Sequence, residues 1–326
     1  MSNKVGITTT VPVEVVYAAG CVPVDLNNIF ITDNNPQQMV EDAELAGYPR
    51  NICSWIKGLY SAVMRDKEIN RVIAVTQGDC SNTHALMETL HLEGVEIIPF
   101  AYPYNRDRDM LRLQMEKLME AFGVDWAMVN KAKTELDGVR SVIHRIDDLT
   151  WRDNLVGGFD NHLWQVCCSD FNGDPQKFRS EAEAYLVSLE GASPKTETIR
   201  LGYIGVPPIM TDLYDYLESR GARIVYNEIQ RQFAMPFATD DIIEQYAQYT
   251  YPYDIFWRLE DIQRETRRRG IQGIVHYAQS FCYRQIQDLI IRRKIGLPVL
   301  TIEGDRPLNL DARTKMRIDG FVEMLK

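Results

Sequence analysis

Features that would place this chain in a membrane or on nucleic acid are absent from the sequence. No run of about 18 or more apolar residues occurs, so we expect no membrane-spanning helix. The N-terminal segment has no charged stretch followed by a long apolar core, and it therefore does not look like a signal peptide. The net charge is −10 and there is no basic stripe, which argues against binding to nucleic acid or to an anionic membrane.

The local motifs of several common enzyme classes are also missing. The sequence contains no G-x-G-x-x-G, Walker A, G-x-S-x-G or H-E-x-x-H motif, and no closely spaced C-x₂-C pair. Its 6 cysteines are sparse and lie within periodic segments, so they do not indicate a disulfide scaffold. A reducing, cytoplasmic compartment fits this cysteine usage best.

What the sequence does contain is an alternation of short apolar runs with helical patterns. Strands are expected at 22–26, 71–76, 95–100, 200–204, 222–226, 271–276 and 298–302. Helices are expected at 12–19, 54–64, 82–92, 210–220, 254–269 and 283–294. This alternation predicts an α/β fold with parallel sheets and right-handed crossovers. We expect an N-terminal domain over 1–192, with a helical segment at about 109–189, and a C-terminal domain over 193–326.

The two halves of the chain resemble each other. The spacing from Cys80 to Gly94 equals the spacing from Cys282 to Gly296, and each pair encloses an amphipathic pattern that leads to a strand. This favours two copies of one α/β unit that face each other across a cleft. The alternative is that any two βαβ units look alike at this level of detail.

Three cysteines occupy positions that suit metal binding. Cys53, Cys80 and Cys282 each precede an expected helix, and Cys80 and Cys282 also follow an expected strand. A helix N-terminus favours a thiolate, and ligands gather at the carboxyl ends of parallel strands. Three thiolates with no nearby histidine suit a 4Fe–4S cluster in which one iron has no cysteine ligand. Each cysteine also has an alternative interpretation as a small buried apolar residue.

The other three cysteines are weaker candidates. Cys21 lies at the start of an expected strand and is interpreted as packing. Cys167 and Cys168 are adjacent within an expected helix, so their side chains point in different directions. His276 ends a buried strand and is the histidine that best fits a cleft. The basic run at 264–269 is interpreted as the solvated end of a helix.

Taken in order, several segments resemble one known protein family. They are VPVEVVYAAGCVPVDL, YPRNICSWIKG, VTQGDCSN, IGVPPIMTDLYDYLESRGARIVYNE, GIVHYAQSFCYRQI and GLPVLTIEGDRPLNLDARTKMRIDGFVEML. The chain resembles the dehydratase D-component family, which includes subunits of 2-hydroxyacyl-CoA dehydratases, the iron–sulfur subunits of ATP-dependent benzoyl-CoA reductases, and double-cubane cluster proteins. The cluster cysteines of this family fall on Cys53, Cys80 and Cys282.

The resemblance implies two flavodoxin- or Rossmann-like domains facing a cleft, with a helical elaboration and a 4Fe–4S cluster. It also implies pairing with a homologous subunit, and an ATP-dependent iron–sulfur activator that delivers a low-potential electron. In a dehydratase this electron reduces the thioester carbonyl of an acyl-CoA to a ketyl radical, which expels the hydroxyl group. Ser81, Gln279 and Arg284 are candidates for catalytic contacts, because they lie close to the cluster cysteines in the sequence.

The sequence leaves other functions open. Glu228 stands where the family commonly has an aspartate, and the chain is shorter than many members. One alternative is therefore an electron-transfer protein or small-molecule reductase that does not act on CoA thioesters. Another is a structural partner subunit whose cluster is vestigial. A double cubane, with further ligands from the remaining cysteines, is a less favoured form of the site.

Overall fold

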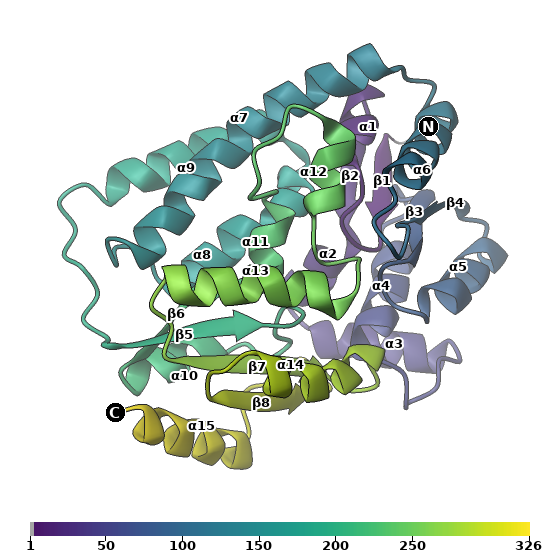
Figure 1. Ribbon diagram of the computed structural model, residues 1–326. Coiled ribbons are helices and arrows are strands. Elements are labelled where there is room, and N and C mark those ends of the chain that lie inside the picture. The colour runs from purple at the N-terminus through teal and green to yellow at the C-terminus, as the bar shows by residue number, and fades with distance from the viewer. Residues whose placement is uncertain (1–2) are drawn as a thin grey trace. The chain divides into compact units, whose positions relative to one another are not determined.

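A computed structural model describes residues 3–326, which form two compact units (Figure 1). Unit 1 consists of residues 1–141, 167–179 and 235–254, of which residues 3 onward are described. Unit 2 consists of residues 142–166, 180–234 and 255–326. Each unit holds one sheet, whereas the long helical stretch in the middle of the sequence contributes to both. The division of the chain between residues 192 and 193 stays a prediction.

The sheet of unit 1 has four parallel strands in the order β2-β1-β3-β4. The strands are β1 (Lys4–Ile7), β2 (Val22–Asp25), β3 (Arg71–Gln77) and β4 (Glu96–Ala101). This is the first part of the flavodoxin-like order, in which the chain turns from one side of the sheet to the other between the first and third strands. The α/β prediction is thus confirmed for this unit, although the short strand β1 was missed.

Helices connect and cover these strands. Those within unit 1 are α1 (Val13–Ala18), α2 (Leu26–Thr32), α3 (Pro36–Leu45), α4 (Ser54–Arg65), α5 (Thr83–Leu92), α6 (Arg108–Phe122) and α12 (Ile242–Gln248). Two 3₁₀ turns, η1 (Cys167–Ser169) and η2 (Phe171–Gly173), also belong to it. Helix α4 packs closely on α2, because a Cβ atom at Gly58 would lie 2.2 Å from the ring of Phe30. Helices α7 (Trp126–Trp151) and α9 (Pro175–Ser188) run through both units.

The sheet of unit 2 has the same topology, with four parallel strands in the order β6-β5-β7-β8. The strands are β5 (Ile199–Ile204), β6 (Ala222–Asn227), β7 (Gly273–Gln279) and β8 (Val299–Gly304). The helices are α8 (Gly158–Val166), α10 (Leu213–Ser219), α11 (Glu228–Phe233), α13 (Ile255–Arg268), η3 (Tyr283–Gln287), α14 (Asp288–Lys294) and α15 (Ala312–Leu325). Two units with one strand order are what a duplication of one α/β unit predicts.

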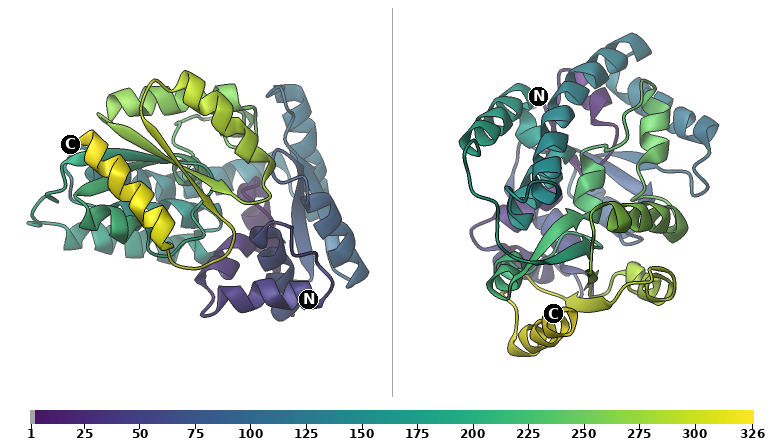
Figure 2. Two further views of the ribbon diagram at one scale, coloured as in Figure 1. Left: turned by 90° about the horizontal axis from the view of Figure 1, so that it is seen from below. Right: turned by 60° about the vertical axis from the view of Figure 1, so that its left-hand side comes forward.

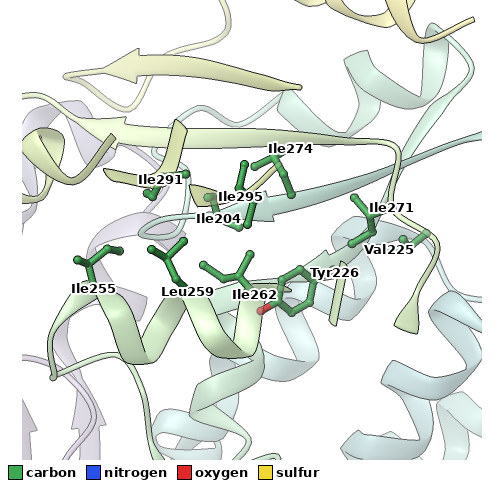
Figure 3. Packing of buried hydrophobic residues seen from close by; sticks show 10 residues of the cluster. All are labelled: Ile204, Val225, Tyr226, Ile255, Leu259, Ile262, Ile271, Ile274, Ile291 and Ile295. Carbon is green, nitrogen blue, oxygen red and sulfur yellow. The ribbon is translucent and has the colours of Figure 1, made fainter. Parts of the chain in front are cut away.

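Helices cover both faces of the second sheet. Ile255, Leu259 and Ile262 recur at helical spacing along α13 and point at a cluster of buried isoleucines (Figure 3). Burying each of these side chains contributes about 1.5–3 kcal/mol. Ile274 of β7 joins this cluster, whereas a Cβ atom at the preceding Gly273 would meet α15. Successive strand residues face opposite sides, so α13 and α15 (yellow in Figure 2) lie on opposite faces.

Some expected elements were placed incorrectly. The helix expected at 283–294 begins as the 3₁₀ turn η3 and becomes α-helical only at Asp288. Cys167 and Cys168 lie in the 3₁₀ turn η1 after α8 ends, not within a helix. The run 264–269 is not wholly solvated, because Arg269 is buried and paired with Asp147 at 2.6 Å. Arg269 and Asp147 are far apart in the sequence, so a local sequence pattern could not indicate that they pair.

Candidate functional site

In a sheet of this topology, ligands bind at the carboxyl ends of the two strands where the connections diverge. These are β1 and β3 in unit 1, and β5 and β7 in unit 2. Cys80 lies in the loop that follows β3, and Cys282 lies in the loop that follows β7. The two cysteines therefore occupy equivalent positions in the two units.

The loop that carries Cys80 is tightly constrained within unit 1. Gly78 has a φ of +103°, and a Cβ atom there would lie 2.7 Å from Cβ of Pro252, so only glycine fits the turn. Asp79, which follows Gly78, is also held in place: its carboxylate accepts a hydrogen bond of 2.8 Å from the hydroxyl of Tyr251. Helix α5 begins three residues after Cys80, whose carbonyl accepts from the Thr83 amide at 3.1 Å. Ser81 lies exposed in the same turn.

Cys53 is the N-cap residue of α4 and is buried in unit 1. Helix α4 precedes β3 and returns to its start, so the N-terminus of α4 lies at the edge where β3 ends. The preceding loop is fixed by Lys57, which donates to the carbonyl of Arg50 at 2.9 Å and pairs with Glu44 at 2.8 Å. Unit 1 therefore carries Cys53 and Cys80 at the same edge of its sheet. The unpaired amide groups of the first turn of α4 favour a thiolate there.

Cys282 is the N-cap residue of η3. The backbone amide of Cys282 donates to the carbonyl of Gln279 at 3.1 Å, and the Gln285 side chain donates to the same carbonyl at 2.6 Å. Phe281, just before the cysteine, has a φ of +64°. These contacts fold the loop back on the end of β7 and hold the thiol at the carboxyl edge of the second sheet.

A small pocket opens at this edge, wholly within unit 2. It has about 10 Å³ of free space, enough for about one water molecule. Its lining comes from the ends of β5 and β7, from α13 and from η3. The lining residues are Gly205, Val206, Arg258, His276, Tyr277, Ala278, Gln279, Cys282, Arg284, Gln285 and Gln287. Three residues selected from the sequence, Gln279, Cys282 and Arg284, are therefore brought together here.

The Gln279 amide is engaged within the protein. Its oxygen accepts from the Tyr277 hydroxyl at 2.6 Å, and its nitrogen donates to the carbonyl of Asp305 at 3.0 Å. Gln279 is buried, and these bonds hold it in one orientation. It thus shapes the pocket and orients the Cys282 loop. The guanidinium of Arg284 lies over the ring of Tyr283, 5.2 Å from its centroid.

An ion pair that the sequence analysis did not select borders the pocket. Arg258 of α13 makes two hydrogen bonds to Glu228, at 2.7 and 2.9 Å, and a third to Gln287 of η3 at 2.7 Å. The Glu228 carboxylate also accepts from the amide of Gly205 at 2.9 Å. Burial opposes ionisation of Glu228, but the Arg258 charge outweighs it and lowers the pKa of this carboxyl. The pair ties the ends of β5 and β6 to the Cys282 loop.

A second polar group at the pocket is His276, the histidine that the sequence favoured. Its Nδ1 lies 2.7 Å from a carboxylate oxygen of Asp288, the first residue of α14. The same carboxylate accepts from Thr301 at 2.6 Å and from Arg292 at 2.7 Å. Burial opposes ionisation of Asp288, but the hydrogen bonds from His276, Thr301 and Arg292 hold its pKa well below the usual range. Asp288 is therefore a firmly ionised partner for the imidazole.

Two of the remaining cysteines, Cys167 and Cys168, lie in surroundings that oppose ionisation of their thiols. Burial, reinforced by Asp170 and Asp25, raises the pKa of the Cys167 thiol to about 12. Burial raises the pKa of Cys168 further still. In the absence of a metal ion, both thiols keep their protons at neutral pH. The assignment of Cys53, Cys80 and Cys282 as the donor set stays a prediction.

That donor set is divided between the units. Unit 1 holds Cys53 and Cys80, and unit 2 holds Cys282. Within residues 3–326, no group of three or more histidine, cysteine, aspartate or glutamate side chains is arranged to hold a metal ion. The convergence of the three thiols on one cluster, and the roles of Ser81, Gln279 and Arg284, stay predictions. None of the described helices is long and apolar enough to cross a bilayer.

The sequence model of a family described as 2-hydroxyglutaryl-CoA dehydratase, D-component, matches residues 8–325, which is nearly the whole chain. No curated protein matches the chain.

Proposed function

Because the chain belongs to the 2-hydroxyglutaryl-CoA dehydratase D-component family, we propose that it is the iron–sulfur subunit of a 2-hydroxyacyl-CoA dehydratase. In this proposal it pairs with a homologous subunit, and an ATP-dependent iron–sulfur activator supplies its electrons. The substrate is a 2-hydroxyacyl-CoA thioester.

One observation carries the proposal. Cys80 and Cys282 follow equivalent strands of two sheets with one topology, and Cys53 lies at a helix N-terminus on the edge where Cys80 lies. Three thiols at the carboxyl edges of parallel sheets are a soft donor set at the place where α/β folds bind ligands. Thiols buried for packing alone have no reason to recur at these edges.

In this proposal Cys53, Cys80 and Cys282 hold a 4Fe–4S cluster. When bound, the cluster supplies a low-potential electron and one iron without a cysteine ligand. The protein contributes rigid loops, which Gly78 and Gln279 fix. In unit 2 it also contributes a polar pocket beside Cys282.

Iron and sulfide analysis after anaerobic reconstitution tests the cluster, together with EPR of the reduced protein. We expect about four irons per chain in the wild type, and a loss of most of this iron in Cys53→Ser, Cys80→Ser and Cys282→Ser. Cys21→Ser is the matched control and should retain the iron. Absence of iron from the wild type, or equal loss in the control, contradicts the ligand assignment.

A turnover assay tests the reaction class. With activator, ATP and the partner subunit, we expect a 2-hydroxyacyl-CoA to be converted to the 2-enoyl-CoA and water. Reduction of an aromatic or unsaturated thioester instead would identify a benzoyl-CoA-reductase type of enzyme. A reducible cluster without any binding of CoA thioesters would identify an electron-transfer protein or a reductase of other small molecules.

A further inference from the structure

The imidazole of His276 is held in one orientation and one tautomer. Ionised Asp288 can only accept hydrogen bonds, so the Nδ1 atom of His276, 2.7 Å away, must carry the hydrogen. In a neutral imidazole the other nitrogen, Nε2, is then a hydrogen-bond acceptor. Thr301 and Arg292 fix the carboxylate from its other sides.

His276 lines the pocket, and Asp288 occupies the Nδ1 edge of its ring. Among the described residues, no hydrogen bond engages Nε2 of His276, although the side chain is almost fully buried. A Cβ atom at Gly205 would lie 3.4 Å from the adjacent ring carbon, Cδ2. Gly205 and His276 both line the pocket, so the absence of a side chain at Gly205 leaves this edge of the ring open.

The size of the pocket limits what can bind there. Its free space of about 10 Å³ accommodates a group the size of water. Of the two guanidinium groups that line the pocket, Arg258 is already paired with Glu228, and Nε2 of His276 as an acceptor calls for a hydrogen-bond donor rather than an anion. An acceptor nitrogen in a space of this size fits a hydroxyl group.

We propose that Nε2 of His276 accepts a hydrogen bond from the substrate hydroxyl group, and that Asp288 is the positioning residue that fixes the tautomer. This inference rests on the proposed function, and it assigns the residue that recognises the hydroxyl group of the substrate. The ligand is a 2-hydroxyacyl thioester, and the matching acyl thioester without the hydroxyl group binds less well.

Calorimetry on the anaerobically reconstituted protein, with its partner subunit, tests this with 2-hydroxybutyryl-CoA and butyryl-CoA as probes. We expect the wild type to bind the hydroxy compound about 5- to 10-fold more tightly, as one hydrogen bond in a largely buried pocket provides. His276→Gln should remove this preference while leaving the affinity for butyryl-CoA nearly unchanged. His91→Gln, at an exposed position on α5, is the control and should keep the preference.

Asp288→Asn gives an independent test if the histidine variant folds poorly. Arg292 holds the oxygen of the new amide, so the amide nitrogen turns toward His276 and donates to Nδ1, which places the hydrogen on Nε2. The preference should disappear again, whereas a purely structural role would weaken the binding of both probes together. A preference retained in both variants, or equal binding of both probes to the wild type, overturns this inference alone. Failure of both probes to bind the wild type overturns the proposed function as well.

Discussion

Glu228 and Arg258 form a buried ion pair in unit 2, with hydrogen bonds of 2.7 and 2.9 Å. Both side chains are 1% exposed, so neither charge is solvated by water. Removing one partner leaves the other charge buried without compensation, which is far more costly than losing an exposed pair. The pair also joins the end of β6 to the loop of Cys282, through the contact of Arg258 with Gln287.

We therefore expect Glu228→Gln to lower the free energy of unfolding by about 3–5 kcal/mol, measured by urea denaturation. The control is Glu244→Gln, which removes a partner of Arg108 from a more exposed pair in unit 1. That change should cost less than about 1 kcal/mol. Similar losses in the two variants would show that burial of the Glu228 pair does not matter.

A buried pair of acidic groups in unit 1, Asp25 and Asp170, predicts how stability depends on pH. Asp170 is buried beside Asp25. The backbone amide of Asp25 donates a hydrogen bond of 2.7 Å to the carboxylate of Asp170. Burial, reinforced by the charge of Asp25, raises the pKa of Asp170 from its usual value to about 7. The folded state then binds a proton that the unfolded chain has already lost. This stabilisation is present at about pH 4 and disappears as the pH rises through 7.

Replacing Asp170 with asparagine should abolish this part of the pH dependence. Between pH 4 and 8 we expect the free energy of unfolding of the wild type to fall by a few kcal/mol at most relative to that of Asp170→Asn. Urea unfolding at each pH measures both values. Asp109→Asn, at an exposed position on α6, is the control and should follow the wild type. A wild-type curve parallel to that of Asp170→Asn would refute the raised pKa.

The elements around the site could be read from local patterns, because they depend on contiguous apolar runs. The strand at 71–76 and the helix after Cys80 were found within about one residue of their observed ends. Their alternation was enough to place Cys80 and Cys282 at the carboxyl edges of parallel strands. The relation between the halves was also visible, because the same spacing occurs twice.

The polar partners could not be read in this way. Glu228 and Arg258 are 30 residues apart in sequence, and Asp147 and Arg269 are 122 apart. A charged residue on an amphipathic helix looks solvated unless its partner is known, which is why the burial of Arg269 was missed. Gly205 and Asp288 gave no signal either, because their importance lies in the backbone angle of one and the tertiary partner of the other.

Thiol reactivity tests the raised pKa of Cys167. Its pKa of about 12 leaves roughly 1,000-fold less thiolate at pH 8 than an ordinary cysteine has. We expect iodoacetamide to modify Cys167 in the folded protein at least about 100-fold more slowly than in the chain unfolded in urea, as followed by mass spectrometry. Cys168→Ser removes the neighbouring thiol from the measurement. Equal rates in the folded and unfolded chains would exclude the raised pKa.

Alanine substitutions at two glycines with positive φ distinguish two reasons for a glycine. One is the backbone angle alone, and the other is the lack of room for a side chain. Gly296 has a φ of +70°, and a Cβ atom there would meet no other atom within 4 Å, so Gly296→Ala should cost only about 1–2 kcal/mol of backbone strain. Gly205 has a φ of +98°, and a Cβ atom there would lie 2.3 Å from the carbonyl oxygen of Tyr277. Gly205→Ala must therefore displace β7 as well as strain the turn.

We expect Gly205→Ala to be the more destabilising of the two in urea unfolding, by at least about 1 kcal/mol, because overpacking adds to strain. It should also weaken the preference for 2-hydroxybutyryl-CoA over butyryl-CoA, since the new methyl group would stand against the open edge of His276. Gly296→Ala should leave that preference intact. If the two variants are equally stable and equally selective, the close approach of Gly205 to β7 does not shape the pocket.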